Sequence, residues 1–189
     1  MVYESTLERD AAYILIADSR VASIIDQPEP VEYVDEDGVV HQHTFDFLVK
    51  LHDGKSVAIA VKPSKKVVSS GLDVVVAMIR KQAPKGFADS IVIRTEEFIT
   101  RDRAHNARLI LRCLRDRRES DVAQVMAFAK DLRGAVTIAA LKAATLNSPR
   151  GFFAINCLIG DGVLELVGTG RITDTSMVRP GRNHNTNKH

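Results

Sequence analysis

The feature that most constrains the fold is a pair of alternating segments joined by a short turn. Apolar and polar residues alternate from Val40 to Leu51, and the same period of two runs from Ser56 to Lys62. Such alternation predicts two strands, each with one buried face. Asp46 belongs to the first predicted strand and Lys62 ends the second, so we expect a β-hairpin that carries a carboxylate and an ammonium group.

The register of this hairpin decides whether the two charged groups share a face. Directly opposed residues of an antiparallel pair point to the same side of the sheet. A two-residue turn at Asp53-Gly54 would send Asp46 and Lys62 to opposite sides. We therefore predict a three-residue loop over residues 53–55, or a bulge of equivalent effect, so that Asp46, Ala60 and Lys62 line one surface.

Composition describes an ordinary soluble protein. Hydrophobic residues make up 45% of the 189 and charged residues 26%, which suffices to bury a core. The formal net charge of +2 does not by itself indicate a nucleic-acid partner. The sequence has no apolar run of about eighteen residues, no secretory leader and no CxxC motif, so we expect a cytoplasmic protein without a membrane span.

The hairpin belongs to an alternation of helices and strands that predicts an α/β, or α+β, domain over residues 1–118. Its expected layout is a mixed sheet flanked by helices. The predicted elements are helices over about 3–17, 70–84 and 101–118, and strands over 21–25, 31–34, 40–51, 56–62 and 90–94.

A different pattern over residues 119–180 predicts a small winged helix-turn-helix domain. Three short helices are expected over 121–132, 137–146 and 148–159, followed by strands over 163–167 and 171–173 around a glycine-containing wing. The third helix carries Arg150 but is mostly apolar, so protein docking competes with DNA-groove binding as its role. Residues 181–189 are polar and are predicted to be a disordered tail.

The segments Thr44-Phe45-Asp46-Phe47 and Ala60-Val61-Lys62-Pro63 together resemble the PD-(D/E)xK nuclease core. The sequence departs from that pattern at Phe45, where Pro is usual, and at Ala60, where Glu, Asp or Gln is usual. The fold implied by the resemblance is a nuclease-like mixed sheet, in agreement with the predicted elements.

The resemblance also implies metal-assisted phosphodiester hydrolysis. Mg²⁺, with Mn²⁺ as an alternative, would be held by Asp46, by the backbone carbonyl of Val61 and by Glu8 from the amino-terminal helix. Lys62 would act on the attacking water or on the phosphate. Because Mg²⁺ completes its shell with waters, Ala60 weakens such a site without excluding it, and Ala60→Glu is expected to strengthen metal binding.

The Glu8 helix, Gln27-Pro28, the two core segments and the winged-helix tail occur in an order that resembles a TnsA-type endonuclease. Such endonucleases are the subunits of heteromeric transposases that cut one strand at each transposon end. The resemblance implies double-stranded DNA, an integrase-like transposase subunit and an ATPase regulator as partners. Position by position, it assigns the catalytic places to Glu8, Asp46 and Lys62. No feature of the sequence indicates an oligomeric state.

Basic residues after the hairpin and on the later helices are the candidates for DNA binding. Helical spacing places three arginines on one face of the predicted 101–118 helix. Asp102 and Asp116 accompany them, so a merely solvated face is a competing interpretation. The full set of candidates is Lys65, Lys66, Arg108, Arg112, Arg115, Arg150 and Arg171.

Plainer interpretations of the same residues stay open. Asp46 and Lys62 could be ordinary strand-surface residues, and Glu8 could form a simple helix salt bridge. His41 and His43 are expected to be surface histidines of a strand rather than metal ligands. Two further functions fit the sequence: a non-cleaving DNA-binding adaptor that has kept the nuclease fold, and a phage or restriction-type nuclease.

Overall fold

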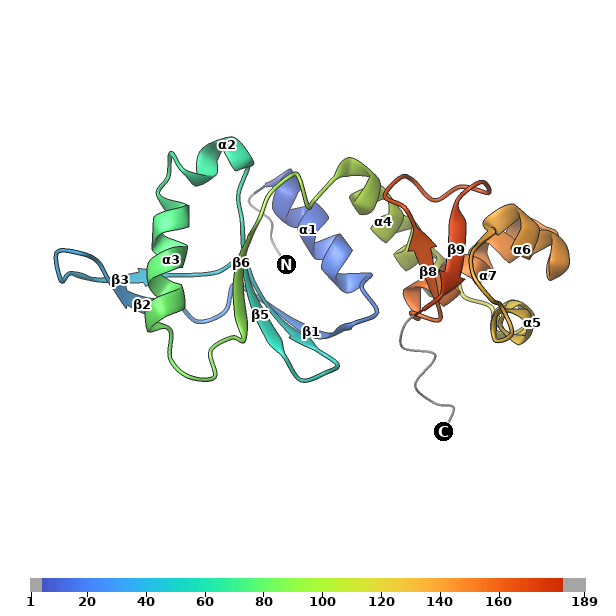
Figure 1. Cartoon of the computed structure of the whole chain (residues 1–189), viewed down its shortest axis with the longest axis horizontal. Helices are drawn as coiled ribbons and strands as arrows, with labels where there is room; N and C mark the ends of the chain where they lie inside the picture. The colour runs from blue at the N-terminus through green and yellow to red at the C-terminus, as the bar shows by residue number, and fades with distance from the viewer. Residues whose placement is uncertain (1–4, 182–189) are drawn as a thin grey trace. The chain divides into compact units, whose positions relative to one another are not determined.

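The computed structural model describes residues 5–181, and the chain forms two compact units (Figure 1). The first unit comprises the residues up to Leu15 together with Arg20–Thr100, and the second comprises Ile16–Ser19 together with the residues from Arg101 onward. Helix α4 (Arg101–Arg115) packs on α7 (Pro149–Gly160), so the division falls before α4 and not at the predicted boundary between residues 118 and 119. The predicted tail, apart from Gly181, lies outside the described residues.

The first unit is built on a four-stranded mixed sheet in the order β1-β4-β5-β6. Strands β1 (Val21–Asp26), β4 (Phe47–Leu51) and β5 (Ser56–Val61) are antiparallel neighbours. Strand β6 (Ser90–Arg94) runs parallel to β5, and a parallel pair needs a crossover connection. The segment that makes this crossover contains two helices.

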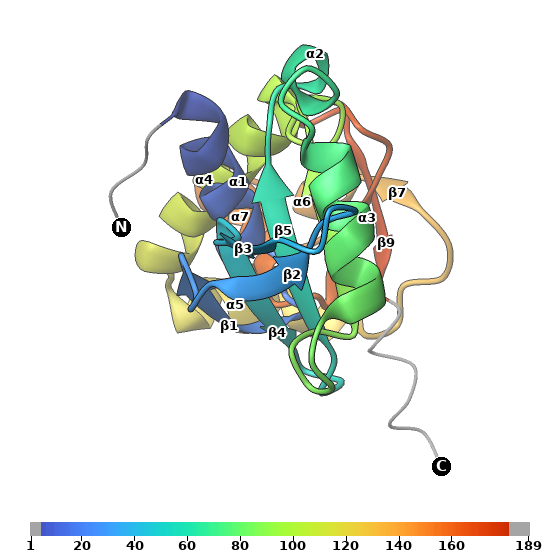
Figure 2. The same ribbon diagram turned by 90° about the vertical axis from the view of Figure 1, so that its left-hand side faces the viewer.

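Helices cover both sides of this sheet. Helix α1 (Thr6–Ile16) lies on one side and α3 (Leu72–Gln82), which belongs to the crossover, lies on the other (Figure 2). Between β5 and α3, the short helix α2 (Ser64–Val67) is exposed. Apolar residues at helical spacing give α3 its buried side, with Val76 and Ile79 at 0% exposure.

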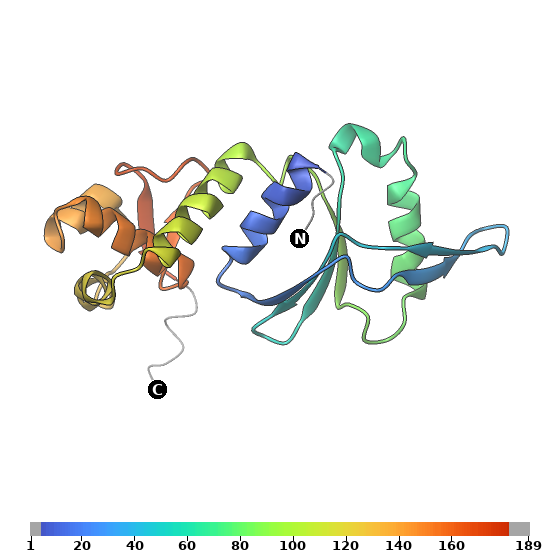
Figure 3. The ribbon, with the colours of Figure 1, turned by 180° about the vertical axis from the view of Figure 1, so that it is seen from behind.

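Strands β2 (Val31–Val34) and β3 (Val40–His43) form a separate two-stranded ribbon, which extends past α3 (Figure 3). The side-chain amide of Gln82 attaches the ribbon to α3, because it accepts a hydrogen bond from the Val34 N–H and donates one to the Val34 carbonyl, both at 2.8 Å. The predicted single strand over 40–51 is therefore two strands, β3 and β4.

An irregularity at Asp46 separates these two strands. Phe47 is aligned with Ile59, yet the Asp46 N–H also donates to the Ile59 carbonyl at 3.0 Å. Two successive residues thus oppose one, which is the count of a β-bulge. At the other end of the hairpin, the Leu51 N–H donates to the Lys55 carbonyl at 2.8 Å, so the loop covers residues 52–54 and begins one residue earlier than predicted.

The bulge decides which aromatic ring faces α3. Phe45 is 1% exposed and belongs to a cluster with Ala58 and Ala60 under α3, whereas Phe47 is buried outside this cluster. Uninterrupted alternation over residues 40–51 would predict Phe45 and Phe47 on one face, and this prediction is wrong, because the extra residue at the bulge turns Phe45 to the other side of the sheet.

In the described part of the second unit, α4 is followed by three helices and by three strands that form a small sheet in the order β7-β9-β8. Its core includes Val125, Ile138, Leu141, Ile155 and Leu158, all at 1% exposure or less. In chain order, the segments that join α4 and α7 in this unit are α5 (Glu119–Ala129), β7 (Val136–Thr137), α6 (Ile138–Ala144), β8 (Leu164–Val167) and β9 (Met177–Pro180).

The second strand of the carboxy-terminal hairpin is β9, so the prediction of a strand over 171–173 is wrong. Local hydroxyl bonds favour a turn there, since the Thr173 N–H donates to Ser176 Oγ at 2.9 Å and Ser176 Oγ donates to the Arg171 carbonyl at 3.1 Å. Buried Asn106 fixes the preceding residues by donating to the Gly170 carbonyl and accepting from the Ile172 N–H, both at 2.9 Å.

Across residues 5–181, none of the helices combines the length and the apolar character that a membrane span requires.

Candidate active site of the first unit

Asp46 lies at the bulge, where both neighbouring strands hold its backbone. Its N–H bonds to Ile59 in β5, and its carbonyl accepts from the N–H of Gln27, directly after β1, at 3.0 Å. Gln27 has a positive φ of 45°, a conformation uncommon outside glycine. The Asp46 carboxylate then takes the place of a backbone partner, because its Oδ2 accepts a hydrogen bond from the Val61 N–H at 2.7 Å. The carboxylate is thereby fixed at the end of β5, next to Lys62.

The surroundings of Asp46 disfavour its negative charge. Partial burial removes the carboxyl group from water and raises its pKa, and the negative charge of Glu8 raises this pKa further. The hydrogen bond from Val61 and the positive charge of Lys62 act in the opposite direction, and the net shift is upward. Glu8 and Lys62 therefore both lie within electrostatic reach of Asp46.

Glu8 comes from the first turn of α1, where it also closes a capping box. The Ser5 hydroxyl donates to Glu8 Oε1 at 2.8 Å and accepts from the Glu8 N–H at 3.2 Å. This S-x-x-E arrangement satisfies an otherwise unpaired N–H at the start of the helix. Glu8 thus has a structural role at the start of α1 that does not depend on a metal. The S-x-x-E signature predicts this role, and sequence reasoning missed it.

Lys62 directly follows β5 at the edge of the sheet. Its N–H donates to the Arg94 carbonyl of β6 at 3.1 Å, which continues the parallel ladder by one residue. Its side chain is partly buried, and its charge reaches both Asp46 and His43. The structure therefore brings together the acid and the ammonium group of the predicted hairpin.

Ala60 is the position at which the sequence lacks the usual acid. It is 2% exposed and packs in the cluster that contains Leu72, Val76 and Ile79 of α3. A carboxylate at this position would be buried against aliphatic side chains without a partner. The sequence-based expectation is that Ala60→Glu strengthens metal binding. Because the side chain at position 60 faces apolar residues of α3, the structure instead predicts that this substitution lowers the stability of the first unit.

The oxygen donors near Asp46 fit a hydrated cation. Mg²⁺ is commonly bound by one or two carboxylates and keeps several waters. Asp46 and Glu8 repel each other, and a bound cation would relieve that repulsion. Among residues 5–181 there is no group of three or more His, Cys, Asp or Glu side chains arranged for a metal. The side-chain donors near Asp46 are thus two carboxylates, and the Val61 carbonyl as a further oxygen ligand stays a prediction.

The predicted DNA-binding cations have different surroundings. Lys65 and Lys66 are exposed on α2, shortly after Lys62. On α4, Arg112 and Arg115 contact Asp116 at 4.0 and 3.3 Å.

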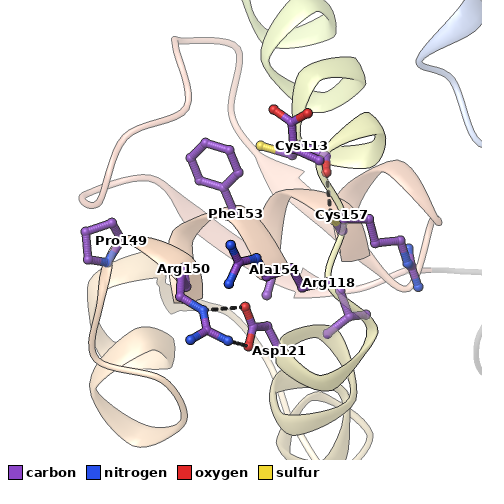
Figure 4. Close-up of a pocket in the computed structure, with 11 residues that line it drawn as sticks. Cys113, Arg118, Asp121, Pro149, Arg150, Phe153, Ala154 and Cys157 are labelled. Atoms are coloured by element: carbon purple, nitrogen blue, oxygen red, sulfur yellow. Dashed lines mark hydrogen bonds and ion pairs between the residues drawn. The ribbon is translucent and has the colours of Figure 1, made fainter.

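The other candidates on the second unit include a third exposed arginine of α4, Arg108. Arg171 pairs with Asp102 at 2.9 Å. Arg150 directs its guanidinium to the carboxylate of Asp121, which is 6% exposed, and makes two hydrogen bonds to it (Figure 4). Arg150 therefore links the start of α7 to α5, a structural task that sequence reasoning missed.

The described part of the structure has two hollows, neither of which is lined by Glu8, Asp46 or Lys62. One of about 230 Å³, between α4, α5 and α7, is lined by Arg150, Phe153 and Cys113 among others (Figure 4), and this volume is below the range usual for ligand pockets. The other, of about 610 Å³, lies beside the β1–β2 connection, where Glu29 and Glu32 give it an acidic lining unsuited to DNA.

Comparison with known families bears on the same part of the chain. Residues 18–102 match the family model described as TnsA-like endonuclease N terminal. This match supports a TnsA-like nuclease. The matched segment contains Asp46, Ala60 and Lys62, whereas Glu8 and nearly all of the second unit lie outside it. No curated protein matches the chain.

Proposed function

We propose that the first unit is a metal-dependent DNA endonuclease of the TnsA-like type, which cuts duplex DNA during transposition. The observation that carries this proposal is that Glu8 and Lys62 both lie within electrostatic reach of Asp46, beside a segment that matches the family. Two acids and an ammonium group at a partly buried site suit phosphodiester hydrolysis, in which a phosphate gains negative charge.

Each residue has a distinct task in this proposal. Asp46 and Glu8 hold the cation, and the Val61 N–H keeps the Asp46 carboxylate oriented through its 2.7 Å hydrogen bond. When bound, Mg²⁺ or Mn²⁺ would polarise the phosphate and ease deprotonation of water. Lys62 hydrogen-bonds the attacking water or a phosphate oxygen and offsets the charge that develops there. Exposed Lys65 and Lys66 contact backbone phosphates of the DNA.

We further propose that the second unit is a winged-helix domain with a docking role. Its order of helix, short strand, two helices and hairpin supports this assignment. Arg150 and Arg171 are engaged by Asp121 and Asp102, which leaves them less suited to DNA phosphates than unpaired arginines would be. An integrase-like transposase subunit and an ATPase regulator, in the cytoplasm, are the partners that this role implies.

Plasmid nicking tests the proposal. The full chain is incubated with supercoiled plasmid and Mg²⁺ or Mn²⁺, alone and with the partner proteins of its transposition system. Asp46→Asn is expected to reduce nicking by about a hundredfold or more, because it removes a charged group of the site. Asp53→Asn is the matched control in the exposed turn of the same hairpin and should retain activity within about twofold. Nicking by the natural chain that does not exceed that of Asp46→Asn with either ion would refute cleavage.

A second candidate function is a nuclease-fold adaptor that binds DNA without cutting it. The buried, apolar setting of Ala60 favours this alternative, because the position that usually supplies an acid is here part of the core. DNA binding that persists in both the natural chain and Asp46→Asn, in the absence of nicking, is the result that would select it.

A further inference from the structure

His43 has a buried nitrogen that the fold does not satisfy. Its Nε2 is inaccessible to solvent and makes no hydrogen bond within the described part of the chain. The ring ends β3, opposite Val31 of β2, and stands edge-on to Phe45 with ring centres 4.7 Å apart. A buried polar atom without a partner costs about 1–3 kcal/mol, so its presence calls for an explanation.

The charge of Lys62 reaches His43, and the backbone offset at Asp46 suggests why. Because Asp46 and Phe47 both oppose Ile59, the next residue along, Phe45, comes opposite Ala60, and the two do share one core cluster. The β4–β5 ladder ends at Phe47 and Ile59, and the same offset extended beyond it would bring His43 opposite Lys62. Consistently, burial and then the charge of Lys62 lower the pKa of His43, which favours the neutral imidazole.

The ammonium of Lys62 is the second group that bears on this nitrogen. Among residues 5–181, no hydrogen bond or ion pair holds it. A neutral imidazole with its proton on Nδ1 presents a lone pair at Nε2, and an ammonium group carries three donors and no acceptor. The two unsatisfied groups are therefore chemically complementary.

We propose that His43 is a positioning residue for Lys62: in solution the Lys62 side chain turns to donate to His43 Nε2 a hydrogen bond that neither group makes in the structure, and the ammonium is thereby held near Asp46. The role of Lys62 in hydrolysis rests on the proposed function, but the hydrogen bond itself does not. A held ammonium loses less side-chain freedom when it meets a phosphate or a water, so His43 acts on cleavage only through Lys62.

Nuclear magnetic resonance of the ¹⁵N-labelled full chain tests this hydrogen bond directly. The rate at which the Lys62 ammonium exchanges its protons with water is measured near 5 °C, with Lys62→Arg to assign the signal. We expect His43→Leu to speed this exchange about tenfold, because one charge-assisted hydrogen bond is lost. His43→Gln, which places an amide oxygen near the former Nε2, should largely restore the slow rate. His41→Gln on the same strand is the matched control and should leave it unchanged.

The nitrogen shifts of His43 in the natural chain give a second measurement that needs no variant. We expect the Nδ1–H tautomer. A proton on Nε2, or equal Lys62 exchange in the natural chain and His43→Leu, would overturn the proposal and favour an N–H contact with the Phe45 ring instead.

Plasmid nicking separates this inference from the proposed function. Exchange that depends on His43 in a chain that does not nick would keep the positioning role and reject the nuclease. Nicking activity together with a Lys62 exchange rate that is the same with and without His43 would support the nuclease and reject the positioning role. If both hold, His43→Leu should lower the cleavage rate with little change in DNA affinity, and His43→Gln should recover it.

Discussion

Charged side chains that form ion pairs between segments of the second unit contrast with the two like charges at Asp46 and Glu8 in the first unit. In the second unit, ionic groups tie segments together, as Arg117 does with Asp161 at 2.7 Å and Lys142 with Asp174 at 2.9 Å. In the first unit, the Asp46 carboxylate meets the like charge of Glu8. Groups held in unfavourable surroundings are characteristic of sites that bind or react. The contrast therefore favours the first unit as the place of chemistry and the second as a self-stabilised scaffold.

The largest expected effect comes from adding a charge to the core of the first unit. Ala60→Glu would bury a carboxylate under α3, and we expect it to lower the free energy of unfolding of this unit by about 3 kcal/mol or more at pH 8. Ala77→Glu, on the exposed side of α3, is the matched control and should stay within about 0.5 kcal/mol.

Tyrosine fluorescence during urea unfolding measures this effect for the first unit alone. The chain has no tryptophan, and of its three tyrosines the two in the described residues, Tyr13 and Tyr33, belong to the first unit. An Ala60→Glu variant as stable as Ala77→Glu would contradict the packing of position 60 and would revive the idea that an acid can be restored there.

The second prediction removes a charge from the first unit and should stabilise it. The pKa of Asp46 is raised in the folded chain, so ionisation costs the folded state more than the unfolded state. We expect Asp46→Asn to match the natural chain near pH 4, where an unfolded aspartate titrates at about 3.9, and to become the more stable of the two as pH rises through the folded pKa. Urea midpoints across this pH range measure the gap, and a gap that shrinks with rising pH would contradict it.

A divalent cation should reverse this order. At a cation concentration about a hundredfold above its Kd, binding adds about 2.7 kcal/mol to the stability of the natural chain. Asp46→Asn should gain much less, because it lacks one of the two carboxylates. Equal stabilisation of both chains by Mn²⁺ would place the cation elsewhere.

The smallest expected effect lies in the second unit, where removal of a charge should destabilise. Lys142→Met breaks the pair with Asp174, whose side chain is 54% exposed, so the loss should be only about 0.5–1 kcal/mol. Lys130→Met, an exposed lysine on the same unit, is the control and should be neutral. Amide hydrogen exchange in α7 measures both. A stabilising Lys142→Met would remove the contrast between the units.

Periodicity predicted most of the regular elements, because burial imposes it on the sequence. Strands β2 and β6 have the predicted bounds, and the helices differ by a few residues at their ends. The position of the bulge was not predictable, because the alternation of apolar and polar residues continues without a break across residues 44–46 and predicts a single strand there. The strand over 171–173 failed for a related reason: hydroxyls of Thr173 and Ser176 bond locally and outcompete pairing.

The candidate site was predictable only in part. Asp46 and Lys62 stand out because a family pattern names them, but the setting of Ala60 depends on contacts with α3 that spacing does not reveal. Ser5 was visible through the S-x-x-E signature and was overlooked. His43 was considered as a surface histidine or, less favoured, as a metal ligand, because its burial depends on how the ribbon joins the sheet.

The position of the acid has an evolutionary consequence. Asp46 is itself the supernumerary residue of its strand: Phe47 opposes Ile59, and Phe45 shares the core side with Ala60. Deletion of the Asp46 codon would make Phe45 and Phe47 consecutive. The β4–β5 hydrogen-bond ladder would then continue without a bulge, and each ring would stay on its present side of the sheet. Loss of one codon can therefore remove the Asp46 carboxylate and leave the fold unchanged. Such a deletion is a short evolutionary route from a nuclease to a protein that binds DNA without cleaving it.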